Sequence, residues 1–172
     1  EVVLKMASEL DTVVEGLELL GGFDLSKGCI GGMSAGGMAV IQRLLEPHIF
    51  KVAILEATVG NLEPMRNLPL CDGLGAEEFH SLNPIERLSK WKDIPVQAFH
   101  SRHDELIPYS GQKSFIDALK EKCEQPEIIE LVSFDRTGAP YEHMGFGRES
   151  AFVKKVQVEF ISKYLQIDME TK

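Results

Sequence analysis

The sequence predicts an α/β fold with three layers, in which helices cover both faces of a mainly parallel sheet. Along the chain, segments with apolar residues at helical spacing alternate with short apolar runs that are typical of buried strands. Parallel strands require such helical crossovers, because each strand must start again from the same edge of the sheet. The 172 residues are 44% hydrophobic and 26% charged, so we expect residues 1–172 to form a single domain with a sizeable core.

The chain opens with an amphipathic helix. Apolar residues recur at steps of three and four between Val3 and Leu17, which predicts a helix over residues 2–20 that Gly21 and Gly22 end. The later elements are, in order, a strand over 27–31, a helix over 35–45, a strand over 50–55, a strand over 96–100, a helix over 110–122, a strand over 128–134 and a helix over 153–164.

Charge and cysteine content exclude several classes of protein. The net charge is −9 and no run of Lys or Arg is present, which argues against nucleic acid or an anionic membrane as a partner. No apolar run is long enough for a membrane span. The three cysteines, Cys29, Cys71 and Cys123, are odd in number and form no CxxC pair, so we expect free thiols and a cytoplasmic location.

A glycine cluster surrounds one serine at the predicted junction of a strand and a helix. Gly32, Ser34 and Gly36 fit the pattern Gly-x-Ser-x-Gly, which is typical of a sharp turn that exposes a nucleophilic serine. We expect glycine at positions 32 and 36 because side chains there would collide, and at Gly31 and Gly37 so that the helix packs close to the strand. The alternative is a glycine-rich turn that binds phosphate, but the lysine of a Walker motif and the Gly-x-Gly-x-x-Gly spacing of dinucleotide-binding loops are both missing.

The helix that follows Ser34 begins at Ala35. Its first N–H groups are free and carry the positive end of the helix dipole. We therefore expect the Ala35 N–H to stabilise an oxyanion.

Two further strands end in residues that could activate Ser34. Asp104 follows the strand at 96–100, and His143 lies in a loop after the strand at 128–134. Because parallel strands end at the same edge, we expect Ser34, Asp104 and His143 to meet there as nucleophile, acid and base. Asp135 is a rival for the acid but lies only a few residues before His143. Glu105 and Glu142 are interpreted as solvated neighbours.

A metal site is an alternative at the same edge. His100 and His103 lie close to Asp104 in sequence, but no convincing further ligand cluster follows them. A packed or hydrogen-bonding role is therefore the better interpretation of these histidines.

Three segments, GGMSAGG, HSRHDELIP and the loop around His143, resemble the α/β-hydrolase superfamily. The resemblance is closest to the esterases of the dienelactone-hydrolase and prolyl-oligopeptidase-like branch, and it spans nearly the whole chain. It implies the roles given above for Ser34, Asp104 and His143, without a cofactor or a metal. Family members have further strands and an oxyanion loop before the nucleophile, so we expect this chain to be the C-terminal part of that fold, lacking its N-terminal strands.

Two expectations follow for the surroundings of the site. We expect an upstream segment or a second copy of the chain to cover the open edge of the strand at 27–31. The segment 59–92, with a short helix over 85–90, is expected to form a small cap, in which Met65 and Phe79 line a substrate pocket together with Met33. The alternative is a packed connection that only covers the sheet.

The function that this pattern predicts is a serine hydrolase of small carboxylic esters or thioesters. Two alternatives stay open. One is a non-catalytic hydrolase-like binding domain, and the other is a peptidase or acyltransferase that uses the same triad.

Overall fold

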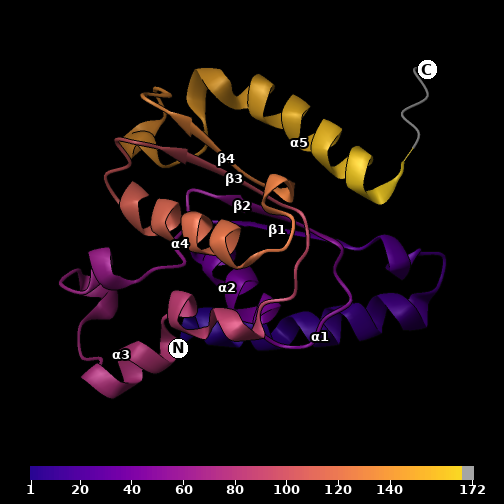
Figure 1. The fold of residues 1–172 in the computed structure, drawn as a ribbon, viewed down its shortest axis with the longest axis horizontal. Helices are drawn as coiled ribbons and strands as arrows, with labels where there is room; N and C mark the ends of the chain where they lie inside the picture. Colours follow the sequence, from indigo (N-terminus) through magenta and orange to yellow (C-terminus); the bar gives the residue numbers. More distant parts are fainter. Residues whose placement is uncertain (168–172) are drawn as a thin grey trace.

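The computed structural model describes residues 1–167, with only the backbone described at Leu70; the expected domain includes residues 168–172, which lie outside this range. Its centre is a four-stranded parallel sheet in the order β1-β2-β3-β4 (Figure 1). The strands are β1 (Cys29–Met33), β2 (Val52–Glu56), β3 (Val96–Ser101) and β4 (Ile129–Phe134). All four predicted strands are confirmed, although β1 and β2 begin two residues later than expected.

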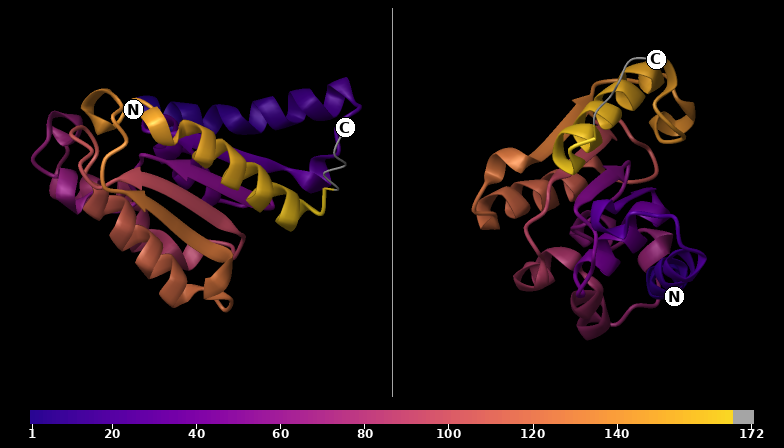
Figure 2. Two further views of the ribbon diagram at one scale, coloured as in Figure 1. Left: turned by 90° about the horizontal axis from the view of Figure 1, so that it is seen from above. Right: turned by 90° about the vertical axis from the view of Figure 1, so that its right-hand side faces the viewer.

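Helices form the outer layers. One face of the sheet carries α2 (Ala35–Leu44) and α4 (Tyr109–Lys122), and α1 (Val2–Leu20) packs on the outside of α2. The other face carries α5 (Ser150–Leu165), so the sheet lies between helices as predicted (Figures 1 and 2). No helix within residues 1–167 is long and apolar enough to cross a membrane.

Alternation along the strands divides the core in two. In β2, Ala53 and Leu55 belong to the cluster beneath α2 and α4, whereas Val52 and Ile54 belong to the cluster beneath α5. The two clusters lie on opposite faces because successive side chains of a strand point to opposite sides, and both are buried because helices cover both faces. The sheet is therefore covered on both faces, as parallel sheets require.

The segment between β2 and β3 holds a helix that the sequence pattern missed, α3 (Ala76–Leu82). The helix expected over 85–90 is present as a 3-10 helix, Pro84–Lys90. Asn83 fixes the segment from within: its fully buried side chain accepts a hydrogen bond from the Leu62 N–H at 2.9 Å and donates to Glu86 at 2.8 Å. A separate bond ties the segment to α2, because Gln42 of that helix donates to the Leu82 carbonyl at 2.7 Å.

Strand β1 lies at one edge of the sheet. Within the described residues it pairs only with β2, from Cys29 opposite Val52 to Met33 opposite Glu56. Among residues 1–167 its second edge therefore has no partner strand, which is the arrangement that the sequence led us to expect.

Candidate active site

Ser34 occupies a strained turn between β1 and α2. Its φ is 53° and its ψ is −124°, a conformation that residues other than glycine rarely adopt. The turn is tied to the end of β2 on both sides, since the Ser34 N–H donates to the Glu56 carbonyl at 2.9 Å and Thr58 Oγ1 donates to the Ser34 carbonyl at 2.8 Å. These bonds hold the serine at the carboxyl edge of the sheet.

Two of the surrounding glycines are required by close backbone approach. A Cβ on Gly32 would lie 2.5 Å from the carbonyl of Gly36, and a Cβ on Gly37 would lie 2.6 Å from Cβ of Thr58. Two expectations were wrong. A Cβ on Gly36 would meet no atom within 4 Å, and one on Gly31 would approach Ile54 of the neighbouring strand at 3.3 Å, so Gly31 serves strand–strand rather than helix–strand contact.

Three side chains from three different loops form one hydrogen-bonded line. The Ser34 hydroxyl lies 2.9 Å from Nε2 of His143, and Nδ1 of His143 lies 2.7 Å from Oδ2 of Asp104. The structure therefore brings together Ser34, His143 and Asp104, as the sequence predicted. Asp135, the rival acid, instead lies 3.3 Å from His103 and is 82% exposed.

The environment of Asp104 keeps its carboxylate ionised. Burial alone would raise the pKa, but hydrogen bonds from His100, from His143 and from the backbone N–H groups of Ile107 and Leu106 hold the pKa of Asp104 at about 2. An ionised acid at this position orients the His143 ring and stabilises its charged form.

Glu142 holds the loop that carries His143. Its carboxylate accepts hydrogen bonds from the Thr137 N–H (2.6 Å), the Thr137 hydroxyl (3.0 Å), the Ser101 hydroxyl (2.9 Å) and the Gly138 N–H (2.9 Å). The expectation of a solvated neighbour was wrong for this residue, because Glu142 is only 8% exposed. The bond from the Thr137 N–H is the main cause that lowers the pKa of Glu142 to about 2.

The backbone beside His143 is also strained. Tyr141 and Glu142 have φ values of 56° and 50°, which non-glycine residues adopt only where the surroundings enforce it. Four hydrogen bonds to one carboxylate provide that enforcement. Glu142 is therefore a positioning element of the site that no sequence motif identified.

The remaining predicted site residues lie close to Ser34 in the chain or within the segment 59–92. Met33 is the half-buried last residue of β1, and Ala35 is the first residue of α2. Met65 and Phe79 are 1% and 2% exposed and belong to a buried cluster with Met38. As buried residues they can shape a neighbouring pocket from beneath, but they present almost no surface to a ligand.

A cavity of 290 Å³ adjoins the same cluster. Met38, one turn of α2 beyond Ser34, and Val59, just after β2, contribute to its wall. Its complete lining is Glu1, Val2, Val3, Leu4, Met38, Gln42, Val59, Leu62, Cys71, Leu74, Leu82 and Pro84. The lining is mostly apolar, so the cavity suits an apolar group.

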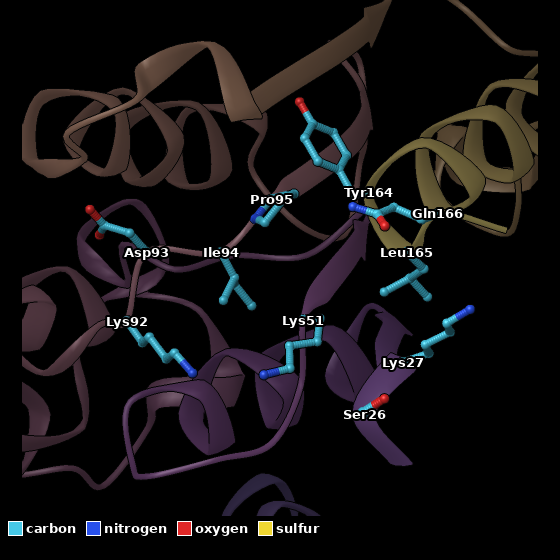
Figure 3. Close-up of a pocket in the computed structure, with 10 residues that line it drawn as sticks. All are labelled: Ser26, Lys27, Lys51, Lys92, Asp93, Ile94, Pro95, Tyr164, Leu165 and Gln166. Atoms are coloured by element: carbon cyan, nitrogen blue, oxygen red, sulfur yellow. The ribbon is translucent and has the colours of Figure 1, made fainter. Parts of the chain in front are cut away.

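A larger hollow of 460 Å³ lies at the amino-terminal ends of the strands, away from the carboxyl ends that carry Ser34 (Figure 3). Residues just before β1, β2 and β3, among them Lys27, Lys51 and Lys92, form it together with the end of α5. Ser34 follows the other end of β1, so this hollow is separate from the triad.

One group of possible metal ligands occurs among residues 1–167. Glu63, His80 and Glu86 offer atoms within 4.8 Å of one another, but all three are exposed. The Arg66 guanidinium forms a bidentate contact with the Glu63 carboxylate, and Nδ1 of His80 lies 2.9 Å from Oε1 of Glu86. These mutual contacts account for the closeness of the three side chains, which are not part of the hydrogen-bonded set Ser34, His143 and Asp104.

Comparison with known proteins supports the architecture. The sequence model of the prolyl oligopeptidase family matches residues 7–167. None of the curated proteins compared with the chain matches it.

Solved structures show the same fold at low sequence identity. An acylaminoacyl peptidase in complex with Z-Gly-Gly-Phe-chloromethyl ketone superposes with a TM-score of 0.77 at 22% identity over 95% of this chain. The acylaminoacyl peptidase of Pyrococcus horikoshii gives 0.75 at 21% over 95%, and a puromycin-hydrolyzing peptidase of Mycobacterium tuberculosis gives 0.74 at 17% over 95%. The chain spans 28%, 28% and 26% of these three proteins.

Proposed function

Because this chain belongs to the prolyl oligopeptidase family, we propose that it is a serine peptidase domain that cleaves peptide bonds through a covalent acyl-enzyme. The family match confirms the resemblance inferred from the three motifs. It also favours the peptidase alternative over the ester or thioester hydrolase that the sequence first suggested. The observation that carries the proposal is the continuous hydrogen-bonded line from Ser34 through His143 to Asp104.

Each residue of the line has a defined role in the proposed reaction. Nε2 of His143 takes the hydroxyl proton as Ser34 attacks the peptide carbonyl, and Asp104 stabilises the resulting imidazolium. The N–H of Ala35, at the positive end of α2, donates to the oxyanion of the tetrahedral intermediate. His143 then protonates the leaving amine, and water releases the acyl group from Ser34.

The apolar cavity beside Met38 supports a preference for substrates with an apolar side chain near the cleaved bond. Met33, together with the segment that holds Met65 and Phe79, would shape the approach to Ser34. Ester and thioester cleavage through the same acyl-enzyme is the second candidate, since an activated serine can attack the acyl carbonyl of an ester or a thioester as well as that of an amide.

The decisive experiment is labelling of the 172-residue chain with a fluorophosphonate, with Ser34→Ala and His143→Ala as variants. We expect labelling of the wild-type chain and none of either variant. Ser26→Ala removes an exposed serine outside the line and is expected to label normally. A folded wild-type chain that is not labelled would contradict the proposal and favour a non-catalytic binding domain.

Substrate class is tested separately by comparing a peptide amide with the ester of the same acyl group. A peptidase cleaves both, and its rate on the amide falls with Ser34→Ala. Cleavage of the ester alone would favour the ester or thioester hydrolase.

We also propose a cytoplasmic location. The three cysteines are free, and free thiols persist in a reducing compartment.

A further inference from the structure

His100 lies directly behind the acid of the triad. It is the penultimate residue of β3, and its side chain is fully buried. Its ring is enclosed by Asp104 and Ile107 from the loop after β3, and by Gln112 and Tyr109 from α4. The proposed mechanism gives this buried histidine no role.

The orientation of Gln112 determines what the first ring nitrogen must do. Nε2 of Gln112 lies 3.0 Å from the Leu55 carbonyl, to which it donates. The amide oxygen of Gln112 therefore faces Nδ1 of His100, with which it forms a hydrogen bond. An amide oxygen can only accept, so Nδ1 must carry a hydrogen.

The second ring nitrogen also faces only acceptors. Nε2 of His100 lies 3.0 Å from the Ile107 carbonyl and 3.2 Å from Oδ2 of Asp104. Both oxygens of the ionised Asp104 carboxylate act as acceptors, because Oδ1 accepts from the backbone N–H groups of Leu106 (2.9 Å) and Ile107 (2.7 Å), and Oδ2 lies 2.7 Å from Nδ1 of His143. Nε2 must therefore carry a hydrogen as well.

We infer that His100 is a charged imidazolium in the folded protein and that it acts as a positioning residue, which fixes the Asp104 carboxylate in the orientation that His143 requires. The positioning role rests on the proposed function, whereas the charge does not. The titratable side chains in contact with the ring are Asp104 and Tyr109, whose ring centroid lies 5.7 Å away at an interplanar angle of 83°. Two hydrogens on the ring supply a donor toward the Gln112 amide oxygen and a donor toward the Ile107 carbonyl and Asp104, and the charge pairs with the carboxylate.

This arrangement extends the triad into a longer chain of contacts. From Ser34 the line runs through His143, Asp104, His100 and Gln112 to the Leu55 carbonyl of the central strand β2. The acid is thereby anchored to the sheet as well as to its own loop. Such support keeps the catalytic side chains within the small range of positions in which the reaction is fast.

The charge is tested by nitrogen-15 NMR of the histidine rings in the intact 172-residue chain at neutral pH. We expect two ring N–H groups on His100, assigned through its backbone. His103, in the same loop but 48% exposed, serves as the reference for a solvent-accessible ring. A His100 ring with one bare nitrogen would overturn the inference.

The positioning role is tested with His100→Gln, which keeps a buried donor but removes the charge, and with His103→Gln as the matched control. We expect His100→Gln to slow the maximal rate of fluorophosphonate labelling about 10- to 100-fold while half-saturation stays unchanged. We expect His103→Gln to label within about twofold of the wild-type rate. Labelling of a folded His100→Gln chain at the wild-type rate would overturn the role.

The two tests separate this inference from the proposed function. A wild-type chain that is not labelled but shows two ring N–H groups on His100 contradicts the peptidase proposal and supports the charge assignment. If His100→Gln does not fold, the NMR result on the wild-type chain still decides the charge.

Discussion

Two carboxylates fix His143 by different routes. Asp104 holds the ring through Nδ1, whereas Glu142 holds the backbone by binding Ser101 on β3 and the Thr137–Gly138 turn. The strained φ values of Tyr141 and Glu142 would relax without the second carboxylate. Glu142 therefore belongs to the site although it touches no reacting atom.

We predict that Glu142→Gln destabilises the protein by about 1–3 kcal/mol at neutral pH, because the amide turns one acceptor into a donor facing hydrogen-bond donors. The pKa of Glu142 lies at about 2, below its ordinary value of 4.5. The stabilisation is therefore complete above about pH 4.5 and is lost as the pH falls toward 2. Urea unfolding at several pH values should show the gap between wild type and variant narrowing through this window.

Glu105→Gln is the matched control for this experiment, because the Glu105 side chain is exposed. It should leave the free energy of unfolding within about 0.5 kcal/mol of wild type. A gap between wild type and Glu142→Gln that stays constant from neutral pH to pH 2 would contradict the proposed anchor.

At the residue scale, the sequence predicted the site residues that belong to a motif or follow a strand in the expected order. It did not predict the residues whose role depends on contacts made only in the folded protein. Ser34, Asp104 and His143 each follow a strand and carry chemistry that forms a set. Glu142 has no motif of its own, and its burial depends on donors from β3 and from a turn that the sequence does not bring together. The hydrogens on the ring of His100 likewise depend on the orientation of Gln112, which only the fold reveals.

At the scale of elements, the turn between β1 and α2 leaves different amounts of space at the two glycines of the Gly-x-Ser-x-Gly motif, Gly32 and Gly36. We predict that Gly32→Ala destabilises the protein by about 1–3 kcal/mol and reduces labelling of Ser34, because its Cβ would lie 2.5 Å from the Gly36 carbonyl. Gly36→Ala is the matched variant. It should be neutral or stabilising by up to about 1 kcal/mol, because it has free space and alanine favours the helix.

Thermal unfolding and fluorophosphonate labelling of the two variants test this prediction. Equal losses of stability in both would contradict the steric argument. Such a result would mean that the turn demands glycine at both positions for conformational reasons.

Within the part of the chain that the structure describes, strand β1 has one edge without a partner strand, and an open edge of this kind favours association. We predict that the isolated chain pairs with a second copy through β1 and that amides in residues 29–33 become more protected from hydrogen exchange as protein concentration rises. Amides of the central strand β2 provide the reference, because they should be protected at every concentration. A monomer in which the edge amides of β1 exchange freely would contradict the prediction.

Strong periodicity explains which elements the sequence could predict. The strands β2, β3 and β4 and the helices α1, α2, α4 and α5 carry apolar residues at clear spacing, whereas β1 is apolar mainly at Cys29 and Ile30 and is indicated by the glycine motif that follows it. Helix α3 is only seven residues long and lies among turns, so its pattern is too short to distinguish from a loop. Its place is fixed by contacts such as the one between the Arg66 guanidinium and the Phe79 ring, 3.9 Å apart, which no local rule foresees.

At the scale of the whole molecule, the wall of the apolar cavity is formed jointly by the start of α1, by α2 and by the segment 59–92. We predict that Leu62→Trp, which narrows this cavity, lowers kcat/KM about tenfold or more for a peptide with phenylalanine before the cleaved bond. The corresponding alanine peptide should be affected less than about threefold. Leu68→Trp is the control, because Leu68 packs against the same cluster without lining the cavity.

Equal losses on both peptides, measured as kcat/KM with chromogenic anilides, would show that the cavity does not select the substrate. In that case the apolar lining would serve packing alone. The substrate preference would then have to come from another part of the molecule.

The wide separation of Ser34, Asp104 and His143 along the sequence determines when during synthesis the site can first form. Ser34 and its base His143 are separated by 109 positions, and the acid lies between them. During synthesis the serine emerges first and has no partner to remove its proton until β4 and the loop after it have been made and docked. If the proposed activity is correct, the nascent chain cannot attack its own unfolded segments, because Ser34 is activated only once the loop that carries His143 has docked.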